Sequence, residues 1–135
     1  MASLRQRVAC LVCGVVATFA SPAFASEQTF PFSRELMLDV APMRGSKRVP
    51  IIEIAENGAA VIQLWCATTR GQVNVDKDAI TITADQVSPA QCEPERQTRD
   101  DGLLAALAQV TNWRRHGNVV ELIGATKLRF RLMTN

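Results

Sequence analysis

Residues 119–133 read Val-Val-Glu-Leu-Ile-Gly-Ala-Thr-Lys-Leu-Arg-Phe-Arg-Leu-Met. In the second half of this stretch, apolar residues at every other position alternate with basic ones. A period of two residues is typical of a β-strand that buries one face and exposes the other. Gly124 lies between this run and the apolar run before it. The stretch therefore predicts two strands, residues 119–123 and 127–133, joined by a tight turn.

Further strand patterns precede this hairpin. Short apolar or alternating runs are separated by polar turns, of which Asn57-Gly58 tolerates a positive φ. Residues 59–66 are almost wholly apolar, which predicts a central strand buried on both faces. The polar residues Asp76-Lys77-Asp78 predict the turn of another hairpin. The other predicted strands are residues 35–40, 51–54, 72–75 and 79–85.

One helix is expected between these strands and the closing hairpin. Thr98 and Asp101 have the spacing of a capping box, and Asp100 would lie at the positive end of the helix dipole. Arg114 and Arg115, followed by Gly117, match the signals of a helix C-terminus. An apolar stripe at helical spacing would pack on a sheet. It consists of Leu103, Ala106, Leu107, Val110 and Trp113.

The order of elements predicts the fold class. Several antiparallel strands, then one helix, then a closing hairpin are typical of an α+β domain. A chain of 135 residues fits one such domain rather than two.

The first 25 residues have the features of a secretory signal sequence. Arg5 and Arg7 precede an uncharged apolar stretch, residues 8–20, which is shorter than the roughly 20 residues that span a membrane. Ala23-Phe24-Ala25 then has the small-x-small pattern that signal peptidase cleaves. We therefore expect a periplasmic or secreted product that does not span a membrane, with one domain at residues 26–135.

The charge balance excludes some classes of function. The chain has 15 Lys and Arg against 13 Asp and Glu. Because Arg5 and Arg7 belong to the predicted signal sequence, the remaining chain is neutral. A nucleic-acid-binding protein needs clustered excess positive charge, so nucleic acid is excluded as a partner. With 47% hydrophobic residues, the chain is also too apolar to be disordered.

Four cysteines divide into two pairs. Cys10 and Cys13 lie in the predicted signal sequence and are lost on cleavage. Cys66 and Cys92 remain, and in an oxidising compartment we expect them to form a disulfide. Such a bridge stabilises the fold by about 3.5 kcal/mol in the chain-entropy model. The alternative is two buried free thiols.

The order of the elements and the residues that separate them resemble the META domain, the family of HslJ-like envelope proteins of bacteria. The resemblance runs from about Pro50 to the C-terminus. Its main features are the Asn57-Gly58 turn, Cys66 at the end of an apolar run, and Gln91-Cys92 ahead of acidic residues. The other matching residues are Ile52, Ile54, Ile80, Ile82, Leu103, Leu104, Leu107, Val110, Gly117, Val120, Leu122, Leu128 and Phe130.

The resemblance implies a curved antiparallel sheet, a partial barrel, wrapped around one helix in an exported protein. It implies no reaction; members of the family are tied loosely to envelope stress and drug tolerance. Trp65-Cys66-Ala67 stands where the family usually reads Gly-Cys-Asn, so no role of that Asn carries over to this chain.

The residues themselves contain no recognisable catalytic motif. His116 is the one histidine, and we assign it to a helix end or to solvent. Asp76 and Asp78 fit a polar turn better than a calcium site, which needs more oxygen ligands. We therefore expect no catalytic residues, no metal site and no cofactor.

Two groups of basic residues are candidate contact surfaces. Lys127, Arg129 and Arg131 line one face of the last predicted strand. We favour a solvated face that discourages edge pairing; the alternative is a contact with anionic lipid or an acidic partner. The second group would form a partner-binding loop tip. It consists of Arg44, Lys47 and Arg48.

Two main classes of function remain. The first is a non-enzymatic binding or scaffold domain in envelope maintenance or stress tolerance, a monomer whose partner is an envelope protein or lipid. The second is a small periplasmic carrier whose sheet and helix enclose an apolar ligand. A secreted hydrolase inhibitor is a third and weaker candidate.

Overall fold

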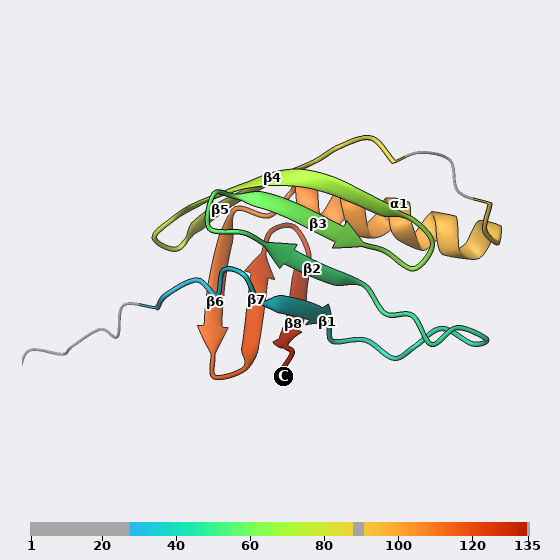
Figure 1. Cartoon of the computed structure of the whole chain (residues 1–135), viewed down its shortest axis with the longest axis horizontal. Helices are drawn as coiled ribbons and strands as arrows, with labels where there is room; N and C mark the ends of the chain where they lie inside the picture. The colour runs from blue at the N-terminus through green and yellow to red at the C-terminus, as the bar shows by residue number, and fades with distance from the viewer. Residues whose placement is uncertain (1–27, 88–90, 135) are drawn as a thin grey trace, which may run out of the picture.

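The computed structural model describes residues 28–87 and 91–134. The predicted signal sequence and its cleavage site lie outside these residues. Within them, eight strands and one helix follow one another, and the strands form a closed antiparallel barrel (Figure 1). The elements are β1 (Glu35–Leu38), β2 (Ile51–Ile54), β3 (Ala59–Gln63), β4 (Thr68–Asp76), β5 (Ala79–Ala84), α1 (Pro94–Ala108), β6 (Asn112–His116), β7 (Val119–Ile123) and β8 (Lys127–Leu132).

The barrel closes because its first and last strands pair. Leu36 of β1 lies opposite Leu132 of β8, and Leu38 lies opposite Phe130. This pairing buries the apolar faces of both strands and removes two exposed sheet edges. The expected antiparallel sheet with one helix is confirmed, but the expected partial barrel is wrong, since the barrel is closed.

The core fills the interior of the barrel. Side chains that point inward from the alternating strands are almost completely buried; Ile62, Val120 and Phe130 have an exposed fraction of 0%. Leu103 and Leu107 of α1 belong to the same buried cluster. The sheet and the helix therefore share one hydrophobic core.

β3 differs from its prediction. Ala60 and Ile62 face the interior, whereas Val61 between them is 42% exposed. The strand ends at Gln63, and the buried Leu64 and Trp65 follow it outside the strand. The prediction of one long strand buried on both faces is wrong. Each barrel strand has an outer face, and the apolar run continued past the end of the strand.

α1 begins earlier than its prediction. Pro94 occupies the first helical turn, where its missing N–H would have no intrahelical partner anyway. Thr98, the predicted N-cap, lies inside the helix, and its hydroxyl donates to the Pro94 carbonyl oxygen at 3.0 Å. Asp100 is not at a solvated helix end but is buried, with 4% of its surface exposed.

α1 also ends earlier than its prediction. After Ala108, the N–H of Val110 donates to the Leu107 carbonyl oxygen, which tightens the last turn. The predicted C-terminal signals, including Arg114, Arg115 and His116, lie on β6. Gly117, with φ of 59°, shapes the β6–β7 turn. Trp113 fits the apolar spacing of the helix and also the alternation of β6, so the sequence pattern does not show where the helix ends and the strand begins.

β5 and β6 pair over only a short length. These strands pair at one position, Ala79 opposite Asn112. α1 connects the two strands and runs back alongside β5 (Figure 1). The helix therefore packs against β5, one of the two strands between which pairing is short.

The predicted turns are confirmed. Gly58 has φ of 85°, and a Cβ there would collide with the Val73 carbonyl oxygen. The Asn57 side chain accepts a hydrogen bond from the Ala59 N–H at 3.0 Å. Lys77, with φ of 55°, turns the chain from β4 to β5.

Candidate ligand-binding site

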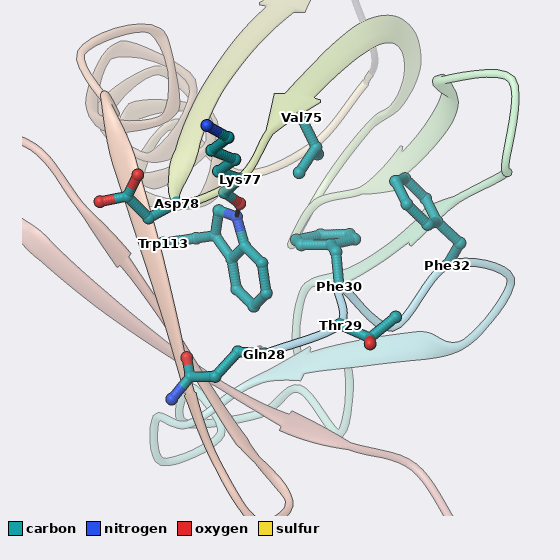
Figure 2. A pocket seen from close by; sticks show the side chains of 8 residues that line it. All are labelled: Gln28, Thr29, Phe30, Phe32, Val75, Lys77, Asp78 and Trp113. Atoms are coloured by element: carbon teal, nitrogen blue, oxygen red, sulfur yellow. Dashed lines mark hydrogen bonds between the residues drawn. The ribbon is translucent and has the colours of Figure 1, made fainter. Parts of the chain in front are cut away.

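A cleft of about 620 Å³ opens at the end of the barrel beside the β4–β5 turn (Figure 2). We call it the aromatic cleft. The segment before β1 contributes two phenylalanines, β4 contributes a valine and β6 contributes a tryptophan. Its lining consists of Gln28, Thr29, Phe30, Phe32, Val75, Lys77, Asp78 and Trp113.

The aromatic side chains are packed against one another. Phe30 meets Trp113 edge to face, with ring centroids 5.0 Å apart and an interplanar angle of 86°. Phe32 lies 4.8 Å from Phe30 at 55°. Pairs with these geometries contribute about 0.5–1.5 kcal/mol each beyond their buried area. They hold the segment before β1 across the end of the barrel, although it forms no strand.

Trp113 is held in one orientation. Its indole N–H donates to the Lys77 carbonyl oxygen at 2.7 Å, and its backbone N–H donates to the Asp78 carbonyl oxygen at 2.9 Å. The β4–β5 turn and β6 are therefore joined at the cleft. Because the indole N–H is satisfied, the ring presents an apolar wall.

The rim of the cleft is polar. Gln28, Thr29, Lys77 and Asp78 are all exposed. The Gln28 side-chain oxygen accepts a hydrogen bond from the Arg115 N–H at 3.0 Å, which ties the N-terminal segment to β6. Lys77 and Asp78 carry opposite charges, so the rim does not select an ion of one sign.

The lining of the cleft is mostly apolar, with a few polar groups. It combines three aromatic rings with these polar groups, the usual arrangement for a small-molecule site. Lys77 and Asp78 are the ionisable residues that line the cleft. Across residues 28–87 and 91–134, no group of three or more His, Cys, Asp or Glu side chains is placed to hold a metal ion.

The basic face of β8 is largely paired with acidic groups. Arg131 contacts Asp39 at 2.8 Å, and Lys127 contacts Glu121 at 3.9 Å. Arg129 lies opposite Glu121 in the strand register. The structure thus brings the three predicted residues onto one face beside acidic neighbours. A contact with lipid or an acidic partner at this face stays a prediction.

All three basic residues of this loop are exposed, and one of them makes hydrogen bonds to the rest of the fold. The Arg48 guanidinium donates to the carbonyl oxygens of Cys66 at 3.3 Å and Ala67 at 3.2 Å, and to the Thr68 hydroxyl at 3.0 Å. Arg44 and Lys47 are exposed, and neither lines the aromatic cleft. A partner-binding tip at this loop also stays a prediction.

Cys66 and Cys92 lie at disulfide distance, with Cα atoms 6.0 Å apart. The same turn is held by a buried carboxylate. Asp100 accepts hydrogen bonds from the N–H groups of Trp65 at 2.8 Å, Cys66 at 3.1 Å and Ala67 at 2.9 Å. We call residues 65–67 with Asp100 the anchored turn. It links the end of β3 to α1.

The sequence did not reveal the aromatic cleft. Residues 30–32 read Phe-Pro-Phe, but no strand pattern in the sequence indicates that this segment folds back onto Trp113 of β6. Trp113 was assigned to the helix, which would have placed it elsewhere. The one sequence feature that could have indicated the cleft is the pair of aromatic residues on either side of Pro31, which lie outside any predicted strand.

The sequence profile of the META domain family matches residues 35–135. The chain belongs to the META domain family. The family match covers all eight strands and α1, and it begins just after the phenylalanines of the cleft. The resemblance predicted from the sequence is therefore confirmed.

A solved structure described as an NMR structure of the protein has the same fold as this META domain. It aligns with a TM-score of 0.56 and 17% identity, over 74% of this chain and 89% of that chain. No curated protein sequence matches the chain. In the part of this META domain that the structure describes, there is no helix long and apolar enough to cross a bilayer.

Proposed function

We propose that this META domain is an exported, non-enzymatic binding domain of the cell envelope, and that its ligand occupies the aromatic cleft. The observation that carries the proposal is the cleft itself: Phe30, Phe32 and Trp113 line a hollow of about 620 Å³ with a polar rim. Phe30 and Trp113 are buried, with 5% and 4% of their surface exposed, and Phe32 is the ring that is partly open to water at this end of the barrel. A ligand with an apolar part would cover that ring.

Export is supported by two features of the chain. The first 25 residues combine a basic start, an apolar stretch and a small-x-small site. The spacing of Cys66 and Cys92 suits a disulfide, which persists in oxidising compartments. A role in envelope maintenance or stress tolerance agrees with both.

The packed interior favours an open binding site over an enclosed carrier. Ile62, Val120 and Phe130, which point into the barrel, are completely buried against their neighbours. An apolar ligand inside the barrel would have to displace such side chains. Replacing a buried side chain such as Ile62 by Ala lowers the free energy of unfolding by about 2–5 kcal/mol. The aromatic cleft requires no such displacement.

Native mass spectrometry of the protein purified from the periplasm tests this proposal. We expect a co-purified mass that is retained in Val61→Ala, a change on the outer face of the barrel, and lost in Phe30→Ala. Phe30 lies before the first strand but belongs to the buried core, so a urea melt must first show that Phe30→Ala is folded under the conditions of the experiment. A bound mass that survives Phe30→Ala at full occupancy would place the ligand elsewhere.

A further inference from the structure

A second hollow adjoins the aromatic cleft. This hollow, of about 300 Å³, lies between the β2–β3 turn and β4. Phe32 and Val75 line both hollows, so the two lie next to each other along β4, and we call the pair the groove. We call the second hollow the amide hollow. Its lining consists of Phe32, Glu56, Asn57, Gly58, Gln72, Val73, Asn74 and Val75.

The groove is longer than a single small ring. It follows β4 from Gln72 to the turn at Lys77. Five steps of about 3.3 Å along a strand give a length of about 17 Å. A ligand that fills both hollows is therefore extended, with several linked units.

The amide hollow offers fixed hydrogen-bonding groups. The Asn57 side-chain oxygen accepts from the Ala59 N–H at 3.0 Å, which leaves its amide N–H groups to donate. The Gln72 amide nitrogen donates to the Asn57 carbonyl oxygen at 3.2 Å, which leaves its side-chain oxygen to accept. Asn74, exposed on the same strand, adds a third amide. These groups recognise neutral donors and acceptors.

The charges of the groove argue against an ionic ligand. Lys77 and Asp78 lie at one end and Glu56 at the other. One cation and two carboxylates, spread over the rim, do not form a site for a phosphate or a fatty-acid headgroup. A single carboxylate at each end of the groove also provides too few ligands to bind a cation.

Phe32 stands where the two hollows meet. It is half-buried, and its ring is tilted 55° from the buried Phe30. A partly exposed ring at the centre of a groove offers a flat apolar face for a ligand ring. The amide groups then lie to one side of that ring and the wall of Trp113 to the other.

We propose that the groove binds a neutral oligosaccharide chain, with one sugar ring on Phe32 and hydroxyl or acetamido groups on the amides of the amide hollow. A pyranose ring has an apolar C–H face and a hydroxyl edge, so it matches both kinds of lining. This inference rests on the proposed function and names the ligand class for the same site.

The test is an NMR titration of the ¹⁵N-labelled secreted protein with chitotriose, N-acetylglucosamine and n-octanol. We expect chitotriose to shift the Trp113 indole resonance and the side-chain amides of Gln72 and Asn74. It should bind about tenfold more tightly than the monosaccharide, a gain of about 1.4 kcal/mol from the added contacts. Asn74→Ala and Phe32→Ala should each weaken chitotriose binding threefold or more. Asn118→Ala, in the exposed β6–β7 turn, is the matched control and should leave it unchanged.

The outcomes separate the inference from the proposed function. If octanol shifts Trp113 and neither sugar does, the oligosaccharide inference is wrong, while an apolar ligand in the aromatic cleft stands. Equal affinity for the trimer and the monomer, with no effect of Asn74→Ala, would also overturn the inference. If none of the three probes shifts Trp113, the inference fails and the proposed function loses its support.

Discussion

Replacing the buried carboxylate of the anchored turn should strongly destabilise the domain. Asp100 is 4% exposed, and it accepts N–H groups from Trp65, Cys66 and Ala67. Hydrogen bonds to a charged group contribute about 1.5–3 kcal/mol, and a buried donor left without a partner costs about 1–3 kcal/mol. Because two of the three bonds are fully buried, we expect Asp100→Ala to lower the free energy of unfolding by about 3–5 kcal/mol. That is a large part of the 5–15 kcal/mol typical of a domain.

Urea unfolding followed by tryptophan fluorescence measures this loss. Asp100→Asn should recover only part of it, because the amide keeps one acceptor and turns N–H groups toward the N–H groups of the turn. Asp101→Ala is the matched control, since the neighbouring side chain is exposed and should change the midpoint little. Equal midpoint shifts in Asp100→Ala and Asp101→Ala would refute the assignment of Asp100 as the anchor.

Three further predictions concern stability. Replacing Cys66 and Cys92 by Ala should cost about 2–5 kcal/mol; two free thiols in the denatured, non-reduced wild type would show that no bridge forms. Leu107→Ala should cost about 2–5 kcal/mol in urea melts because Leu107 is completely buried, and a loss below 1 kcal/mol would mean that its site is loosely packed. Arg131→Gln should change stability by less than about 1 kcal/mol, since its ion pair with Asp39 is largely exposed, and the wild type should not bind anionic vesicles. Salt-sensitive vesicle binding that Arg131→Gln weakens would instead indicate a contact surface.

The sequence predicted most strands of this domain because a strand pattern is local, but it missed β6, which was assigned to the end of the helix. Alternation in residues such as Leu128, Phe130 and Leu132 reports which side of a strand is buried, and it needs no knowledge of the neighbouring strand. Closure of the barrel depends on the pairing of β1 with β8, at opposite ends of the chain. No local pattern specifies that pairing, so an open sheet and a closed barrel were not distinguishable.

The predicted helix boundaries were wrong, and the anchored turn was not predicted, for a related reason. Pro94 marks the first turn of α1, but Thr98 and Asp101 offered a competing N-terminal signal farther along. Asp100 looked like a solvated residue of a helix end. Its burial depends on N–H groups at residues 65–67, which the fold brings close from a distant part of the chain.

The candidate site was the part least accessible from the sequence. The aromatic cleft combines a segment before β1 with the β4–β5 turn and β6. The basic residues that attracted attention in the sequence lie elsewhere, and Arg48 and Arg131 make contacts within the fold. Aromatic residues are a normal part of any core, so Phe30 and Trp113 carried no functional signal until their positions were known.

The two tryptophans allow a direct test of binding at the aromatic cleft. Trp113 lines the cleft, whereas Trp65 lies in the anchored turn against Asp100. The measurement is the pair of indole N–H resonances in a ¹H–¹⁵N spectrum of the labelled protein, titrated with a small-molecule extract of the cell envelope. We expect the Trp113 resonance to shift in a saturable manner while the Trp65 resonance stays in place. A shift of Trp65 alone, or no shift of either resonance at saturating extract, would contradict the account of this domain as a binding protein with its site at the aromatic cleft.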